Sequence, residues 1–205
     1  MRHLNKLFVA VLLAMGLNTQ AQDSNNPWAL SFGVNAVSNR FGAASEFGDQ
    51  FSEYFNAKEY WNILPSVSYV NVSRSIGDNL SVGITGSVNQ IDKLVTRTPG
   101  TNDYVVTNPG DVSYYGLDAM AKYSFMSMIG TKWFEPYLNL GGGYTWLDDK
   151  GNGTLNGGVG ITLWFVENVG LTLQSTYKHT FEDQAEANVP RHIQHLAGLT
   201  FKFGG

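Results

Sequence analysis

The chain has 205 residues, of which 15% are charged, with a formal net charge of −4 and no cysteine. This length suits one domain, and the missing cysteines exclude disulfides, thiolate chemistry, cysteine metal sites and an acylated-cysteine anchor. The acidic balance also argues against nucleic acid as a partner.

The first 21 residues have the pattern of a secretory signal peptide. Two basic residues, Arg2 and Lys6, precede a short apolar run, and the closing Thr-Gln-Ala fits a small-x-small cleavage site. The apolar run is shorter than the roughly 20 residues that a membrane-spanning helix needs. We therefore expect residues 1–21 to be removed and residues 22–205 to form one domain with a net charge of −6.

Eight segments of the mature chain alternate between apolar and polar residues. A period of two predicts a β-strand with one apolar and one polar face. The register of the second segment is open, because Val67 and Tyr69 have one parity and Val70 and Val72 the other, and Pro65 fits a strand end. The predicted strands span residues 28–36, 63–75, 80–89, 113–125, 135–146, 154–165, 169–178 and 193–203.

The connections between these strands mostly alternate in length. An even number of strands of about ten residues, joined in this way, is typical of a barrel that crosses an outer membrane. With the chain ends in the periplasm, the longer connections face the outside and the short ones face the periplasm. The outer connections are 37–61, 91–112, 147–153 and 180–190, and the periplasmic turns are 76–79, 126–132 and 166–168.

The polar faces of these strands are rich in glycine and carry few charges. A water-facing surface would hold many more charges, about 25–35% of it. We therefore assign the polar face to a narrow lumen and the apolar face to lipid, with a soluble β-barrel as the alternative. The charges assigned to the lumen are Arg74, Asp118, Lys122, Glu135, Lys178 and Lys202.

Aromatic residues cluster at the strand ends, where the two interfaces of a bilayer favour them. Together with the alternation, they predict an all-β fold, an eight-stranded antiparallel up-and-down transmembrane β-barrel. The girdle residues are Trp28, Trp133, Phe165, Phe201 and Phe203 at the periplasmic end and Trp61, Tyr144, Trp146 and Tyr177 at the outer end.

The lumen charges favour pairing. We expect Lys122 to lie nearly opposite Glu135 and to form a salt bridge with it, and Asp118 to meet either Lys178 or Arg74. An eight-stranded cylinder is just wide enough to be filled by its own side chains, which favours a structural plug over a gate or an ion path.

The outer rim around the last hairpin combines histidines and carboxylates: His179, Glu182, Asp183, His192 and His195. A metal site or a hydrolase is conceivable there. However, His192 and His195 differ in parity, and no serine is expected beside a histidine on a matching face. We expect no catalytic, cofactor or metal site.

Three stretches carry a resemblance to a known family. They are Trp133-Phe-Glu-Pro-Tyr-Leu-Asn-Leu-Gly-Gly-Gly-Tyr-Thr-Trp146, Gly153-Thr-Leu-Asn-Gly-Gly158 and Leu199-Thr-Phe-Lys-Phe-Gly-Gly205. With the order of the strands, they resemble the N-terminal barrel of OmpA-type outer-membrane proteins from Bacteroidota, over nearly all of the mature chain. Members of that family commonly continue into a C-terminal peptidoglycan-binding domain. This sequence departs from that plan by stopping at Gly205, so peptidoglycan is expected as a partner only through a domain not present here.

The expected function is that of a non-enzymatic, structural or anchoring outer-membrane barrel, or a subunit of a larger surface assembly. A small diffusion pore is the alternative, and a lipid-A-modifying enzyme is the third reading. The expected partners are outer-membrane lipid, lipopolysaccharide and other outer-membrane proteins that bind the acidic, aromatic connection Val37–Trp61. No cofactor is expected.

Overall fold

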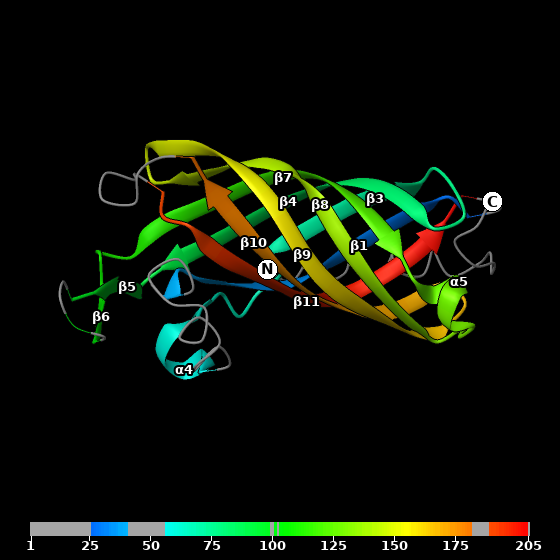
Figure 1. Ribbon diagram of the computed structural model, residues 1–205, viewed down its shortest axis with the longest axis horizontal. Coiled ribbons are helices and arrows are strands. Elements are labelled where there is room, and N and C mark those ends of the chain that lie inside the picture. Colours follow the sequence, from blue (N-terminus) through cyan, green and yellow to red (C-terminus); the bar gives the residue numbers. More distant parts are fainter. Residues whose placement is uncertain (1–25, 41–55, 99–100, 102, 182–188, 205) are drawn as a thin grey trace, which may run out of the picture.

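The computed structural model describes residues 26–40, 56–98, 101, 103–181 and 189–204 (Figure 1). The predicted signal peptide and most of the first long connection lie outside these residues. Among the described residues, no helix is long and apolar enough to cross a membrane.

The strands form one antiparallel sheet that closes on itself. Its order is β11-β10-β9-β8-β7-β4-β3-β1-β2, and β11 also pairs with β1 from Trp28–Phe203 to Ser38–Ile193. β2 and β3 pair with successive parts of the same edge of β1, so they count as one strand of the barrel. The wall therefore has eight strands, which confirms the predicted barrel. The strands of the wall are β1 (Trp28–Ser38), β2 (Asn62–Ile63), β3 (Tyr69–Ser75), β4 (Leu80–Ile91), β7 (Val112–Ser124), β8 (Phe134–Leu147), β9 (Lys150–Val166), β10 (Val169–Thr180) and β11 (His192–Phe203).

Three predicted connections contain further structure. The connection 91–112 holds a separate hairpin of β5 (Leu94–Arg97) and β6 (Tyr104–Thr107). A short helix, α5 (Met126–Ile129), fills the turn between β7 and β8, and another, α4 (Ala57–Tyr60), precedes β2. The hairpin between β8 and β9 is shorter than predicted, because the ladder continues to Leu147–Lys150.

The second predicted strand is interrupted, which corrects its expected continuity. Between the pairs Gly33–Tyr69 and Ala36–Ile63, β1 advances by three residues and the opposing chain by six. The opposing chain therefore has three residues more than β1 in this interval. Because side chains alternate between the two faces, an odd number of extra residues changes whether odd-numbered or even-numbered residues face the lumen. This reversal explains why outward Ile63 is odd-numbered whereas outward Val70 and Val72 are even-numbered, with Tyr69 facing the lumen. It falls beside Pro65, which has no N–H to donate to a ladder.

Asn35 closes the wall at this interruption. Its backbone N–H donates to Ser68 Oγ at 2.8 Å, and its side-chain Nδ2 donates to the carbonyls of Ser68 and Val88 at 2.8 and 2.7 Å. The Val88 N–H also donates to the Ser68 carbonyl, at 2.8 Å. A buried side-chain amide thus replaces the missing backbone partners, which would be costly to leave unpaired.

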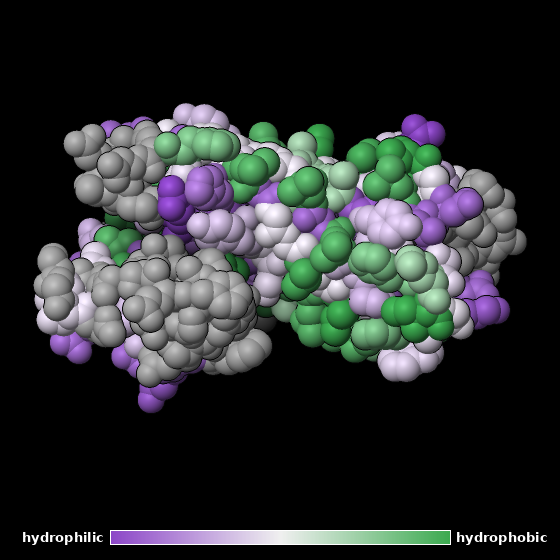
Figure 2. All heavy atoms as spheres, in the orientation of Figure 1, coloured by the Kyte–Doolittle hydropathy of each residue, from purple (hydrophilic) through white to green (hydrophobic). Residues whose placement is uncertain are grey.

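The two faces of the wall are inverted relative to a soluble barrel. On β4, outward Val82 and Ile84 are 41% and 59% exposed, whereas inward Ser81 and Thr85 are 7% and 5% exposed. Figure 2 shows hydrophobic residues gathered on the middle and one side of the visible barrel face, with hydrophilic residues towards both ends. The lumen is therefore polar and the outer surface apolar, as the sequence predicts.

Inward glycines leave the space that bulky lumen side chains occupy. A Cβ on Gly160 would overlap the ring of Tyr137, and a Cβ on Gly170 would lie 2.8 Å from Trp164 Cε3. Outward Gly86 has no heavy atom within 4 Å of a Cβ position. The glycines of the polar face therefore have a packing role rather than a turn role.

Gly160→Ala is expected to destabilise the barrel by about 1–3 kcal/mol, because the added methyl group overpacks against Tyr137. Urea unfolding in detergent, followed by tryptophan fluorescence, measures this change. Gly86→Ala is the matched control, with little expected loss of stability. Equal effects of the two substitutions would contradict the packing role of Gly160.

Candidate functional site

The first cluster of lumen charges lies in the half of the barrel nearer the long connections. Lys178 Nζ donates to Asp118 Oδ2 at 2.7 Å and to the hydroxyl of Tyr114 at 3.2 Å. Asn156 Nδ2 donates to the other oxygen of Asp118, also at 2.7 Å, and the Tyr114 hydroxyl contacts His192 Nε2 at 3.1 Å. Lys178 has no exposed surface. Its charge is neutralised and hydrogen-bonded inside the wall, as a buried ion pair requires.

The second cluster lies nearer the short turns. Lys122 Nζ lies 2.8 Å from Glu135 Oε1, which confirms the predicted salt bridge. The expectation that the two residues lie nearly opposite each other is wrong, because the ladder places Asn139 opposite Lys122. The long lysine side chain reaches along the strand to Glu135 instead. Trp164 Nε1 donates to Glu135 Oε2 at 2.8 Å, and Lys202 Nζ lies 3.5 Å from the Trp164 ring centroid. Glu135 therefore binds a cation and an indole N–H, with a second cation held against that indole.

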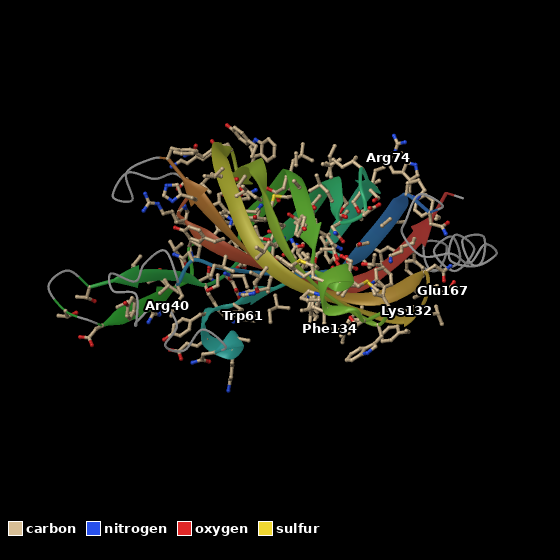
Figure 3. The ribbon with its side chains drawn as sticks, turned by 45° about the vertical axis from the view of Figure 1, so that its right-hand side comes forward. Arg40, Trp61, Arg74, Lys132, Phe134 and Glu167 are labelled. Carbon is tan, nitrogen blue, oxygen red and sulfur yellow. The ribbon has the colours of Figure 1, made fainter. Side chains whose placement is uncertain are left out.

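Arg74 does not belong to the lumen, which corrects its assignment. From the sequence, either Lys178 or Arg74 could be the partner of Asp118, and the structure pairs Asp118 with Lys178. Arg74 lies opposite Trp28 in the ladder, on the outer face, with its guanidinium carbon 5.3 Å from the Trp28 ring centroid. Figure 3 shows its side chain projecting away from the barrel. The cause is the parity reversal within the second predicted strand.

A chain of hydroxyl groups and a small cavity lie next to the second cluster. The cavity has a volume of about 60 Å³, and Tyr137 spans it to donate to Gln174 Oε1 at 2.9 Å. The hydroxyl chain runs across four adjacent strands with spacings of 3.0, 2.6 and 2.8 Å, through Thr162, Thr172, Thr200 and Ser31. Hydrogen bonds between polar side chains thus connect adjacent strands inside the barrel.

The two mouths of the lumen differ. At the turn end, a pocket of about 350 Å³ leads to Lys122 and Glu135. At the loop end, Val37, Ile91 and Tyr114 pack together as a cluster that is at most 6% exposed. The lumen is thus open to solvent from one end and sealed at the other.

The predicted girdle residues lie at the expected ends of the barrel. Trp28, Trp133 and Phe165 are at the turn end and are 38%, 62% and 63% exposed. Phe201 and Phe203 pair with Leu30 and Trp28 at the same end. At the loop end, the rings of Tyr144 and Trp146 lie 4.6 Å apart, and Tyr177 pairs with Ile193 and Gly157. Trp61 also lies at the loop end, where its ring stacks on His195 at 4.0 Å.

The rim histidines do not converge. His192 lies inside the wall, His195 lies outside it, and His179 lies between the rings of Tyr177 and Phe181. Within the described part of the chain, no group of three or more histidines and carboxylates is placed to hold a metal ion. Glu182 and Asp183 fall outside the described residues.

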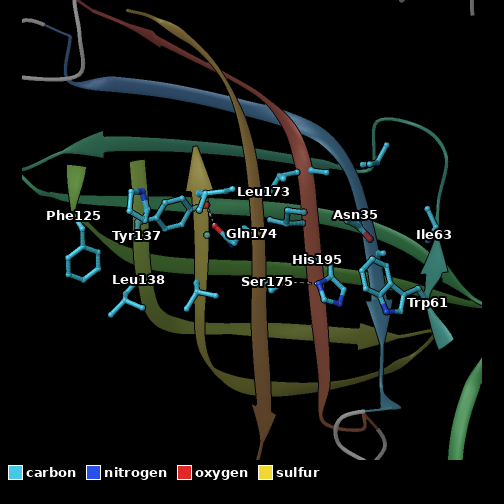
Figure 4. A pocket seen from close by; sticks show the side chains of 18 residues that line it. Asn35, Trp61, Ile63, Phe125, Tyr137, Leu138, Leu173, Gln174, Ser175 and His195 are labelled. Atoms are coloured by element: carbon cyan, nitrogen blue, oxygen red, sulfur yellow. Dashed lines mark hydrogen bonds between the residues drawn. The ribbon is translucent and has the colours of Figure 1, made fainter. Parts of the chain in front are cut away.

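One premise of the sequence analysis was wrong, because a serine does lie beside a histidine on one face. Ser175 of β10 pairs with His195 of β11, and Ser175 Oγ lies 2.7 Å from His195 Nδ1 on the outer surface (Figure 4). Parity alone allowed this pair, since both residues are odd-numbered. The register between the two strands decides it, and the long connection between β10 and β11 does not fix that register from the sequence.

This pair lies in a groove of about 670 Å³ on the outer face of the wall. Its lining residues come from β1, β8, β9, β10 and β11 and from the segment around Trp61 and Ile63. No carboxylate is among the described residues that line it. A serine-histidine pair without an acid resembles a hydrogen-bonding site more than a nucleophile-base-orienter arrangement.

Sequence reasoning missed other functional side chains. Trp164, Tyr114 and Asn156 all bind the lumen charges. Each lies on the polar face of its strand by parity, so the alternation places it in the lumen, but alternation does not say which charge it binds.

Comparison with known proteins supports the fold. No protein-family model and no curated protein sequence matches the chain. Among solved structures, it is similar to the outer membrane protein OprG from Pseudomonas aeruginosa, with a TM-score of 0.55 and 13% identity over 91% of this chain and 100% of that chain. It is also similar to Neisserial surface protein A, with a TM-score of 0.53 and 15% identity over 86% of this chain and 97% of that chain.

A third similar structure is the N-terminal β-barrel domain of Pseudomonas aeruginosa OprF, with a TM-score of 0.52 and 12% identity over 87% of this chain and 98% of that chain. At such identities, the likeness establishes a shared fold, the eight-stranded barrel of outer-membrane proteins.

Asp118→Ala is expected to lower the free energy of unfolding by roughly 3–5 kcal/mol, because it leaves Lys178 charged and buried without its carboxylate partner. Urea unfolding in detergent provides the measurement. Arg74→Ala is the control: it removes an exposed outer charge, and we expect a loss below about 1 kcal/mol. A larger effect of Arg74→Ala than of Asp118→Ala would contradict the lumen assignment.

Proposed function

We propose that this protein is a non-enzymatic barrel of the Gram-negative outer membrane, with a structural or anchoring role and a sealed lumen. The inverted surface carries this proposal: exposed valine, leucine and isoleucine side chains cover the outside, whereas lysine, aspartate and glutamate side chains are buried inside. Only a hydrocarbon surrounding makes such an outer surface favourable. The resemblance to OmpA-type barrels agrees with this role.

In the proposed orientation, the short turns and both ends of the barrel domain face the periplasm. Trp28 and Phe203 lie at the same end as the turns after β3, β7 and β9, and the longer connections lie at the other end. Lipopolysaccharide and the lipid bilayer are then the immediate surroundings. Outer-membrane protein partners would bind the connection Val37–Trp61, of which the structure describes only the two ends.

The packed lumen favours a sealed barrel over a diffusion pore. The ion pair of Lys178 with Asp118 crosses the interior, and the cluster of Val37, Ile91 and Tyr114 closes the loop end. A solute would have to displace both. The alternative of a small pore therefore requires an opening motion of these side chains.

The enzyme alternative has one observation in its favour, the pair of Ser175 and His195 on the outer face. A hydrolase needs, in addition, an orienting group for the histidine and donors for the developing oxyanion. The described groove lining supplies no carboxylate, and the backbone amides at this position belong to the strand ladder. We therefore propose a non-catalytic role for the pair.

The cysteine-free chain allows a direct test of orientation. Asp149→Cys lies in the hairpin between β8 and β9, and Asp78→Cys lies in the turn between β3 and β4; both side chains are exposed. We expect a membrane-impermeant maleimide to label Asp149→Cys in intact cells and Asp78→Cys only after the outer membrane is permeabilised. Recovery of the protein in the soluble fraction, or the reverse labelling pattern, would contradict the proposal.

The sealed lumen is tested by conductance. The purified barrel, inserted into planar bilayers, is expected to show no stable channel, because two clusters of side chains fill its interior. The triple variant Val37→Gly, Ile91→Gly and Tyr114→Gly removes the cluster at the loop end and is expected to raise the frequency of current steps. Stable channels from the unmodified protein would favour the pore instead.

A further inference from the structure

We infer that the outer groove beside Trp61 binds a membrane lipid, with the acyl chain along the groove and an ester or hydroxyl oxygen of the same lipid at Ser175 and His195. This inference rests on the proposed membrane location and adds a specific binding site to it.

The groove is a built concavity and not merely the curved outside of the barrel. Its floor is the outer face of the strands from β8 to β11 and of β1, and the segment of Trp61 and Ile63 forms a wall at one end. The Trp61 ring stacks almost parallel to the His195 ring, with 4.0 Å between centroids and 17° between planes. Figure 4 shows Trp61 beside His195 and Phe125 far from both, at the other end of the groove. A volume of about 670 Å³ lies within the range of about 300–1,000 Å³ typical of ligand sites.

The chemistry of the lining selects an acyl chain. Outward Leu138, Val159 and Leu173 line the groove and are 50%, 57% and 40% exposed. These residues continue the apolar belt that the bilayer covers, so the groove opens into hydrocarbon. Water in such a groove would have few polar partners, whereas a flexible acyl chain can fill it. The occupant that follows from this continuity is a lipid of the surrounding bilayer.

Ser175 and His195 interrupt this apolar surface at one point of the ladder. The neighbouring outward pairs between the same strands are Leu173–Ala197 and Leu171–Leu199, which are entirely apolar. A polar pair at lipid depth is costly unless its groups are hydrogen-bonded. A serine hydroxyl has one donor and two acceptor positions, and the contact with His195 uses only one of them. When His195 Nδ1–H donates to Ser175, the serine O–H can donate to an ester carbonyl; when Ser175 donates to His195, its lone pairs can accept from a lipid hydroxyl.

The position of the pair along the groove gives the lipid a direction. His195 and Trp61 lie towards the loop end of the barrel, and Phe125 and Pro136 lie towards the turn end. A lipid of the leaflet on the loop side would place its oxygen-bearing region at Ser175 and His195. Its chain would then extend along the groove towards Phe125.

The test uses the full mature chain in detergent, titrated with monopalmitoylglycerol, which carries one acyl chain, one ester and two hydroxyls. Native mass spectrometry counts the bound molecules. We expect saturation at one molecule per barrel. The double variant Ser175→Ala, His195→Leu should bind about tenfold more weakly, the effect of losing one or two hydrogen bonds of about 1 kcal/mol each.

Two further variants complete the design. Gln90→Leu removes an outward polar side chain of β4 that does not line the groove, and it should leave binding unchanged. Ala197→Phe fills the groove and should abolish the saturable binding. Equal binding by the double variant and the unmodified protein, or binding without saturation, would overturn the inference. Outer-membrane fractionation and folding of the same variants keep this outcome separate from a failure of the proposed membrane location.

Discussion

The closure of the sheet between β1 and β11 is the constraint on which the rest of the structure depends. Once the wall is closed and its outside is apolar, each polar side chain that points inward must find its partner within a narrow cylinder. The pair of Lys178 and Asp118 meets this requirement with three further hydrogen bonds around it. The pair of Lys122 and Glu135 does so with Trp164. Glycine on the inward face then provides the space for these large side chains.

The two ends of the lumen differ, although the wall of the barrel is nearly regular. The turn end opens into a pocket that reaches Lys122 and Glu135, whereas the loop end is closed by packed apolar side chains. Charges are thus accessible from one side of the barrel and protected from the other. This asymmetry is one of the observations that support the proposed structural role.

The sequence predicted which face of a strand a residue lies on, because this depends on parity within a continuous strand. It did not predict which residues of neighbouring strands contact each other, because this depends on register. Alternation alone assigned Asp118, Lys122, Glu135, Lys178 and Lys202 to the lumen, because each strand there is continuous. It failed for Arg74, since an odd number of extra residues between β2 and β3 changes the parity.

It also missed the contact between Ser175 and His195, since a long connection joins β10 to β11 and neither its length nor the composition of the two strands fixes their register. Short turns fix register locally, and long connections do not.

The interruption at Asn35 has a mechanical consequence. Along most of the wall, neighbouring strands are joined by long backbone ladders, whereas here buried side-chain amides take over: Asn35 joins β1 to β4 and to the interrupted segment, and Asn62 joins β2 to β1. A load applied to the outer connections, for example by a bound partner pulling on the segment before β2, would reach the wall through these amides and through the two backbone pairs of β2. The outer part of this strand position would then detach before the inner part, which pairs with β1 over six residues from Tyr69 onwards.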